Sequence, residues 1–397
     1  MMPHYRRNTY VLSIAIFLAA LSWNQIVPFL SLFLKEMHIS EGQLLYWTGL
    51  VFAVQSVASI LAMPYWGKLG DKYGRKPMII RAGICLAGIY FGMSLCQTPL
   101  QLAVLRFLNG ALTGFIPGSF ALIATNTPEK AAPRAMATAQ TASASGVIIG
   151  PAVGMWLASL LGYRCSMQVS GAAVIISTIL VWRLVQEPNK VKPIEKTSLI
   201  QDFIISIRSP VQLSIMFAVF LSWCFASAIN PYLVLHLKEF GGSVPDWLLG
   251  WIFPLPALAF VLTAHSWTRF GERTSFDRAI FIGLIGAALG AVTLFFPHNI
   301  WVFAVLYFIT GIWIAALSPS IGALTCTKVE ESFRGRAYGI QQSAGTLGAL
   351  LAPLAAAQVG ALFGIRAIFI FVGVLFFVGA FVFVRLCKRW KLAGKKY

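Results

Sequence analysis

Apolar runs long enough to cross a membrane alternate with short polar segments along nearly the whole chain. A helix needs about 20 predominantly apolar residues to cross the hydrocarbon core of a bilayer. Runs of this kind occupy residues 11–34, 43–65, 78–97, 100–122, 136–160, 165–186, 211–236, 246–267, 279–297, 300–323, 336–361 and 364–386. The pattern predicts an all-α integral membrane protein with 12 transmembrane helices.

The two halves of the chain repeat one another. Residues Pro28–Glu36 return as Pro231–Glu239, Leu105–Gly110 as Leu306–Gly311, and Gly162–Arg164 as Gly364–Arg366, with offsets of 203, 201 and 202. We therefore expect two pseudo-symmetric six-helix bundles, over residues 1–186 and 211–397, joined by a polar cytoplasmic loop over 187–210. Parallel repeats of this kind place a substrate site at their interface near the bilayer midplane.

Composition excludes a soluble protein, since 58% of the 397 residues are apolar, 11% are charged and the mean hydropathy is +0.77. The six cysteines are scattered without a C-x-x-C pair, which predicts neither a metal site nor a disulfide framework. The first apolar run follows Arg6 and Arg7 but continues through Leu34. That length exceeds the apolar core of a signal peptide, so we expect a retained first span.

Charge placement predicts the orientation in the membrane. Of 31 Lys and Arg residues, four lie in loops of one side (Lys35, Arg164, Lys238 and Arg366), one lies deep within a span, and 26 lie on the other side, in loops, in the tails or at span ends. Both termini and the central loop are therefore expected in the cytoplasm. The basic tail fits a surface of anionic lipid. A net charge of +18 arranged in this way does not indicate nucleic-acid binding, because no basic groove with interleaved aromatic residues is present.

A charged loop, Gly67–Pro77, joins the second and third runs. It resembles the signature loop of the major facilitator superfamily, G-x-L-x-D-[RK]-x-G-R-[RK], and a weaker copy occurs at Thr268–Arg278. The resemblance implies that Asp71 meets a helix N-terminus of the second half and holds the cytoplasmic side shut; the alternative is that Asp71 only balances local charge. The implied cytoplasmic gate consists of Gly67, Asp71, Gly74, Arg75, Arg134 and Glu272.

Arg106 is the one charge placed deep within a predicted span. A buried arginine is costly unless it lines water or finds a partner, which favours a role in substrate binding or coupling. Arg106, Asn109 and Gly110 share a helical stripe that resembles the superfamily's fourth-helix motif, R-x-x-x-G. A structural arginine held by backbone carbonyls and amide side chains is the alternative.

The fifth run contains glycines at i, i+4 and i+8, namely Gly146, Gly150 and Gly154, with Pro151 between them. Such spacing lets a neighbouring helix approach closely, and physically it indicates only packing. The segment also resembles the antiporter motif G-x-x-x-G-P-x-x-G-G, with Met155 in place of the last glycine. That motif is typical of drug:proton antiporters and favours export.

Several other polar or aromatic residues lie within predicted spans. For Trp23, Asn24, Gln25, Asn109, Asn230, Tyr307 and Gln341, a hydrogen bond between helices and a substrate contact both remain open. Aromatic residues near span ends, such as Trp66, favour the membrane interface. All 13 acidic residues fall at span edges or in loops. A cavity without an embedded acid favours neutral or anionic amphiphiles over cations.

The resemblance covers nearly the whole chain and is strongest toward bacterial multidrug-resistance proteins, over Leu105–Thr127 in particular. It implies a monomeric secondary exporter in a bacterial cytoplasmic membrane that moves a small amphipathic compound against protons, without a cofactor or metal. The alternative is an importer or exporter of an anionic metabolite such as a carboxylate siderophore, which Arg106 would support. No constellation of embedded nucleophiles suggests an enzyme, and no P-loop suggests ATP-driven transport.

Overall fold

The computed structural model describes residues 4–37, 39–128, 131–187, 199–240 and 244–393, and within these ranges all regular structure is helical. The chain forms two compact units. The first consists of Met1–Ile194 and Ser243–Pro254, and the second of Glu195–Gly242 and Leu255–Tyr397.

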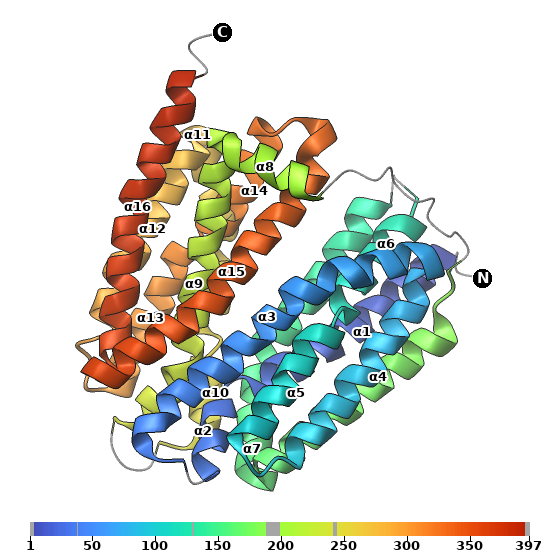
Figure 1. Cartoon of the computed structure of the whole chain (residues 1–397), viewed down its shortest axis with the longest axis vertical. Coiled ribbons are helices and arrows are strands. Elements are labelled where there is room, and N and C mark those ends of the chain that lie inside the picture. Colours follow the sequence, from blue (N-terminus) through green and yellow to red (C-terminus); the bar gives the residue numbers. More distant parts are fainter. Residues whose placement is uncertain (1–3, 38, 129–130, 188–198, 241–243, 394–397) are drawn as a thin grey trace. The chain divides into compact units, whose positions relative to one another are not determined.

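Eight helices build the first unit (Figure 1). They are α1 (His4–Ile26), α2 (Leu30–Glu36), α3 (Glu41–Tyr73), α4 (Arg75–Ser94), α5 (Pro99–Leu112), α6 (Phe115–Asn126), α7 (Ala132–Leu184) and α10 (Asp246–Ile252). Helix α7 packs along both α1 and α4, and α3 packs against α5. A buried apolar core joins α1, α4, α6 and α7, with Ile16, Ile79 and Phe115 almost completely buried.

The second unit also contains eight helices (Figure 1). They are α8 (Leu199–Arg208), α9 (Pro210–Lys238), α11 (Leu255–Arg273), α12 (Phe276–Thr293), α13 (Ile300–Ile314), α14 (Leu317–Lys328), α15 (Glu331–Phe363) and α16 (Ala367–Ala393). Helix α9 packs against α15 and α16, and α12 packs against α16.

Eleven helices within the described ranges are long and apolar enough to cross a membrane. The longest, α7, has a non-helical residue at Gly162 (φ 80°, ψ 163°), which divides it into two membrane-length segments. The predicted all-α fold with 12 spans is thereby confirmed. Large apolar side chains such as Leu160 and Phe377 remain about half exposed, as side chains that face lipid must.

Four of the predicted spans are interrupted where the apolar pattern runs on continuously. Proline accounts for two of the breaks, since it cannot donate the helical hydrogen bond: Pro28 lies between α1 and α2, and Pro254 between α10 and α11. The other two breaks separate α5 from α6 and α13 from α14. At the α5–α6 break the backbone adopts a left-handed conformation at Gly114 (φ 129°).

The internal repeat extends to local structure. Gly162 and Gly364 both have positive φ, at 80° and 86°, and each is followed two residues later by an arginine. Thr98 caps the first turn of α5 by accepting the Gln101 N–H, and Asn299 caps α13 by accepting the Trp301 N–H. These matched turns indicate that the halves share backbone geometry as well as hydropathy.

One helix lies where the sequence predicts only a polar loop. Helix α8 falls within residues 187–210 and leaves Phe203, Ile204, Ile205 and Ile207 between 42% and 53% exposed. The helix has 10 residues, which is too short for a membrane span, and charged residues flank its apolar positions. The search for membrane-length apolar runs therefore did not detect it. Residues 188–198 of the predicted loop lie outside the described ranges.

Candidate functional site

The signature loop is a single-residue turn between α3 and α4. Gly74 forms the turn with φ 103°, a conformation that favours glycine, and its N–H donates to the Gly70 carbonyl at 3.0 Å. Arg75 begins α4, Gly67 is exposed on α3, and Glu272 is exposed near the end of α11. The side chain of Asp71, on which the predicted gate depends, lies outside the described residues.

Glu187, which sequence reasoning missed, caps the first turn of α4. Its carboxylate accepts the backbone N–H groups of Arg75 and Lys76 at 2.8 and 2.9 Å. In return, Lys76 Nζ donates to the carbonyls of Trp182 and Val185 at the C-terminal end of α7. A carboxylate at a helix N-terminus and a cation at a helix C-terminus are both electrostatically favourable. Glu187 and Lys76 therefore hold the N-terminal end of α4 against the C-terminal end of α7.

Trp66 has a specific structural contact in addition to its place near a span end. Its indole N–H donates to the Ala111 carbonyl at 2.6 Å, and the Arg81 guanidinium lies 3.4 Å from its ring centroid. Arg81 in turn donates to the Thr113 carbonyl at 3.2 Å. The contact ties α3 and α4 to the end of α5, where the fourth span is interrupted. The equivalent Trp267 donates to the Ile312 carbonyl, so both repeats have this bond.

Arg106 lies on α5 inside the first unit and is only 5% exposed. Its Nε donates to the Val51 carbonyl at 3.4 Å, and its guanidinium carbon lies 5.2 Å from the Phe52 ring centroid and 5.9 Å from that of Trp23. Aromatic faces attract a guanidinium and replace part of its hydration. Of the predicted substrate residues, the structure thus brings Arg106 and Trp23 together.

Asn109 lies one turn further along α5 and is completely buried. The buried Tyr90 hydroxyl from α4 lies beside Asn109 and within electrostatic reach of Arg106. The polar stripe of α5 therefore faces protein on the α3 and α4 side, and it forms a polar core in the first unit.

The glycines of the antiporter-like motif pack directly onto α1. A Cβ atom on Gly146, Gly150 or Gly154 would lie 2.7, 2.7 or 2.0 Å from a backbone carbonyl oxygen of α1. Gly250 of α10 also packs against α7. A Cβ atom at Gly250 would lie 2.9 Å from both the Pro151 carbonyl oxygen and the Met155 Cβ, so a side chain does not fit there. The motif thus allows two helices to approach the α7 backbone closely.

The remaining predicted polar residues make contacts inside single units. Gln25 is 1% exposed and donates to the carbonyl and hydroxyl of Ser166 at 2.9 and 3.1 Å. Asn24 donates to the Ala20 carbonyl of its own helix at 2.8 Å. In the second unit, Tyr307 donates to Asn230 at 3.5 Å, and Gln341 exchanges hydrogen bonds with Thr325. Bonds between helices account for Gln25 and the Asn230–Tyr307 pair.

A partly open cavity of about 540 Å³ lies within the second unit. It is lined from α9, α11, α13, α14 and α15 by Val219, Ser222, Trp223, Ala226, Ser227, Phe260, Ile314, Leu317, Ser318, Ile321, Gly322, Tyr338, Gln341 and Gln342. The lining contains no charged side chain, and three aromatic rings alternate with hydroxyl and amide groups. Gln341 is the predicted substrate residue that it includes.

A buried histidine lies at the C-terminal end of α9. His236 is completely buried, its Nδ1 lies 3.4 Å from Glu239 Oε2, and the rings of Phe240, Phe303 and Phe369 surround it at centroid distances of 4.9–5.5 Å. Burial raises the pKa of Glu239, and the nearby Arg366 guanidinium opposes that shift. Arg366 also contacts His298 at 3.3 Å.

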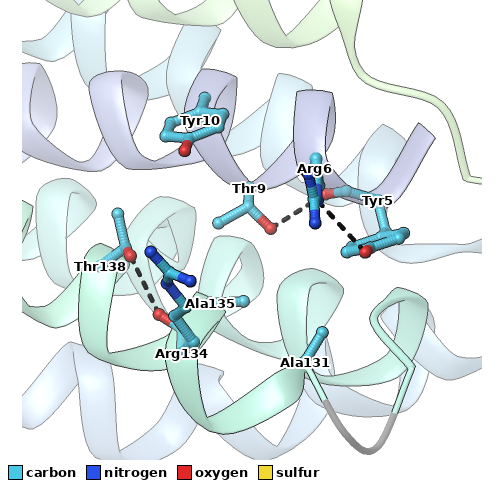
Figure 2. A pocket seen from close by; sticks show the side chains of 8 residues that line it. All are labelled: Tyr5, Arg6, Thr9, Tyr10, Ala131, Arg134, Ala135 and Thr138. Carbon is cyan, nitrogen blue, oxygen red and sulfur yellow. Dashed lines mark hydrogen bonds between the residues drawn. The ribbon is translucent and has the colours of Figure 1, made fainter. Parts of the chain in front are cut away.

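A second cavity, of about 330 Å³, lies in the first unit where α1 and α7 begin (Figure 2). Arg134 of the predicted gate is in its wall, together with Tyr5, Arg6, Thr9, Tyr10, Ala131, Ala135 and Thr138. The structure places Arg134 beside α1, on a different helix pair from the Gly67–Pro77 loop.

The chain matches the model of one protein family, the Major Facilitator Superfamily, over residues 12–247 and 215–391. The match covers nearly all of both repeats. The chain belongs to the Major Facilitator Superfamily. It is therefore a multi-pass secondary transporter and not an enzyme.

Superfamily members of similar sequence include the multidrug resistance proteins MdtG of Proteus mirabilis and of Salmonella arizonae. Each is 29% identical to this chain, over 392 and 393 residues respectively, and the matches cover 97% of this chain and 96% or 97% of the relative. These relatives confirm the resemblance to the drug-antiporter branch of the superfamily.

Solved structures of the superfamily share the fold. The D323A mutant of the nucleoside transporter NupG matches with a TM-score of 0.81 at 14% identity, over 96% of this chain and 99% of that one. The inward-facing, occupied bacterial homologue of the human lysosomal transporter Spinster matches with a TM-score of 0.81 at 14% identity, over 98% of both chains. The predicted major facilitator fold is confirmed.

Proposed function

We propose that this transporter exports small amphipathic compounds, mainly uncharged ones, by alternating access and in exchange for protons. The observation that carries the proposal is the uncharged cavity of the second unit. Aromatic faces such as Trp223 and Phe260 bind apolar surface with little geometric specificity. Side-chain amides and hydroxyls such as Gln342 and Ser222 can satisfy either donors or acceptors. A cavity of this chemistry suits varied neutral ligands, and the full-length similarity to MdtG supports the assignment.

The anionic-metabolite alternative depended on Arg106. With 5% of its surface exposed and two aromatic rings around its guanidinium, Arg106 offers a substrate carboxylate little of its hydrogen-bonding fork. The cavity in the second unit adds no cation that would hold an anion. We therefore favour neutral amphiphiles as substrates and assign Arg106 to organising the first unit.

The proton site that we propose is the His236–Glu239 pair. Glu239 is about half exposed and can exchange a proton with solvent, while His236 Nδ1 lies 3.4 Å from its carboxylate in a buried, aromatic setting. Charged or titratable groups near the pair include Arg366, His298 through its contact with Arg366, and Lys238, which precedes Glu239 in the chain. Protonation of Glu239 changes the net charge beside the buried His236 ring and can therefore bias a conformational equilibrium.

We also infer the orientation and the gate from charge. The excess of Lys and Arg beside one set of span ends favours cytoplasmic termini in a bacterial cytoplasmic membrane. On that side the Glu187–Lys76 contact fixes the turn at Gly74 within the first unit. Because Glu187 is engaged within the first unit, we propose Asp71 as the acid that closes the cytoplasmic side against the second half.

Cavity variants test the substrate proposal. Trp223→Ala should lower the uptake of a neutral amphipathic dye into inverted vesicles, where export is directed inward, at least about fivefold, because an aromatic contact surface is lost. Trp301→Ala is the matched control, since Trp301 is 61% exposed on α13 and outside the cavity, and it should transport normally. Equal uptake by Trp223→Ala and wild type would contradict the proposed site.

A further inference from the structure

We propose that the cavity between the first turns of α1 and α7 is a binding site for a phosphate-bearing anion, held between Arg6 and Arg134. The proposal is independent of the transported substrate, because this cavity lies at the helix ends and shares no residue with the uncharged cavity of the second unit.

Two guanidinium groups define the site. Figure 2 shows Arg6 reaching from α1 and Arg134 reaching from α7 toward the gap between the two helices. Both side chains are exposed, so neither is held by burial in its present position. Arginine presents a planar fork of N–H donors that matches phosphate oxygens in pairs. Two forks on opposite walls can therefore grip one phosphate group.

Hydroxyl groups complete the donor set. Arg6 Nε donates to the Tyr5 hydroxyl at 3.3 Å, so the proton of that hydroxyl is free to be donated to a ligand. Tyr10 supplies a second phenol that is 58% exposed. Thr9 and Thr138 instead donate to carbonyls of their own helices, at 2.9 Å each, and shape the walls.

The electrostatic balance favours an anion. Within the described ranges no carboxylate lines the cavity or pairs with either arginine. Neither α1 nor α7 has an acidic residue in its first turn, so no first-turn carboxylate offsets the positive end of either helix dipole in the part of the chain that the structure describes. A dianion or a phosphodiester would relieve the repulsion between two like charges on neighbouring helices.

The position of the cavity fits a lipid headgroup. It lies where two membrane-length helices begin, and their length predicts that these helix ends lie near the membrane surface. Basic pockets between helices at that level bind anionic headgroups. A volume of about 330 Å³ accommodates a phosphodiester with part of its glycerol. A free phosphate group has the same recognition chemistry, so the two sources are separated by experiment.

Binding to the full-length protein in nonionic detergent tests the site. Dioleoyl phosphatidylglycerol is titrated by native mass spectrometry, and sodium phosphate is titrated by calorimetry. The test variant is Arg6→Gln/Arg134→Gln. The matched control, Arg208→Gln/Arg385→Gln, removes two exposed cations from the second unit. Dioleoyl phosphatidylcholine, whose choline cation opposes the arginines, is the control lipid.

We expect the wild type and the control variant to bind one phosphatidylglycerol with the same affinity, and the test variant to bind it at least about tenfold more weakly, as the loss of charge-assisted bonds requires. Phosphatidylcholine should bind at least about tenfold more weakly than phosphatidylglycerol to wild type. If only the phosphate titration depends on the two arginines, the site takes free phosphate. Equal binding of both probes by the test variant and wild type would overturn the proposal, and so would an equal loss in the control variant.

A more conservative variant separates loss of the binding site from loss of folding. Arg6→Lys/Arg134→Lys keeps both charges and loses both planar forks, so its affinity should fall between those of wild type and the glutamine variant. Its unfolding temperature without a probe should equal that of wild type. Wild-type affinity in this variant would show a diffuse charge effect and would contradict a built site.

Discussion

At the scale of single residues, burial decides what Arg106 can do. A guanidinium that donates to the Val51 carbonyl and lies against Trp23 and Phe52 stabilises α5 against its neighbours and offers little surface to a ligand. The same burial makes it indispensable, since removing one member of a buried polar contact leaves its partners unsatisfied.

We therefore expect Arg106→Ala to lower transport of matched neutral and anionic analogues by the same factor, roughly tenfold or more. Arg106→Lys should not restore transport, because an ammonium group cannot lie flat against two aromatic rings. Uptake of both analogues into inverted vesicles measures this, with membrane insertion checked by surface labelling. A loss confined to the anionic analogue would return Arg106 to direct substrate pairing.

Glu239 gives a second prediction at this scale. Burial raises its pKa above the ordinary value of 4.5, so the folded protein favours the protonated carboxyl. Its contribution to stability is therefore fully present below pH 4.5 and is lost as the pH rises through the raised value. Glu239→Gln should remove this decline from a plot of unfolding temperature against pH.

Arg366→Gln should act in the opposite direction to Glu239→Gln, because the Arg366 guanidinium lowers the pKa of Glu239 and so limits its increase. Its removal should raise the pKa of Glu239 further and move the decline to higher pH. Since the Glu239 side chain is about half exposed, both effects should be small. An unchanged profile in both variants would show that Glu239 does not titrate in a buried setting.

The sequence identifies Arg106 but not Glu187, and the reason is physical. A lone charge inside an apolar run stands out from its neighbours. Glu187, in contrast, lies among other charges, and its partners at Arg75 and Lys76 are 112 and 111 residues away. Only the folded chain brings the start of α4 to the end of α7.

At the scale of helices, the glycines of α7 determine how closely α1 can approach. Membrane helices associate largely through close backbone packing, because lipid is as apolar as their side chains. The motif was predictable as a packing face from its spacing of four residues. Its partner, α1, was not, because a glycine face carries no information about which helix covers it.

Gly154→Ala should destabilise the first unit by about 1–3 kcal/mol, since the new methyl group would lie 2.0 Å from the Gln25 carbonyl oxygen. Gly88→Ala is the control in α4, where a Cβ meets nothing within 4 Å, and it should be neutral or stabilise by about 0.5–1 kcal/mol. Thermal unfolding of both variants in detergent measures the difference. Equal stability would show that α1 and α7 do not pack through this face.

Helix interruptions show the limits of hydropathy. Two breaks, at Pro28 and Pro254, can be anticipated from the sequence because proline has no backbone N–H to donate. At the break after α5, Gly114 has a positive φ, and Pro117 lacks the N–H that a continuous helix would donate to the Thr113 carbonyl. Trp66 and Arg81 also donate hydrogen bonds to carbonyls at the end of α5, and the apolar pattern does not encode these tertiary contacts.

At the scale of the whole molecule, the repeat, the spans and the family were predictable from the sequence, because lipid imposes a length and a hydropathy on every helix. The identity of the cavity lining was only partly predictable. Gln341 was found from its polarity, whereas Phe260 and the serines of α9 and α14 resemble ordinary helix-packing residues until the fold gathers them around one space.

The most direct test of the account is transport by the purified protein in proteoliposomes with an imposed pH gradient, using matched neutral, anionic and cationic analogues of one fluorescent amphiphile. We expect the neutral analogue to move against the proton flux at the highest rate and collapse of the gradient to stop its movement. We also expect Trp223→Ala to lower this rate and Trp301→Ala to leave it unchanged. Movement of the anionic analogue alone, or movement that ignores the pH gradient, would contradict the account.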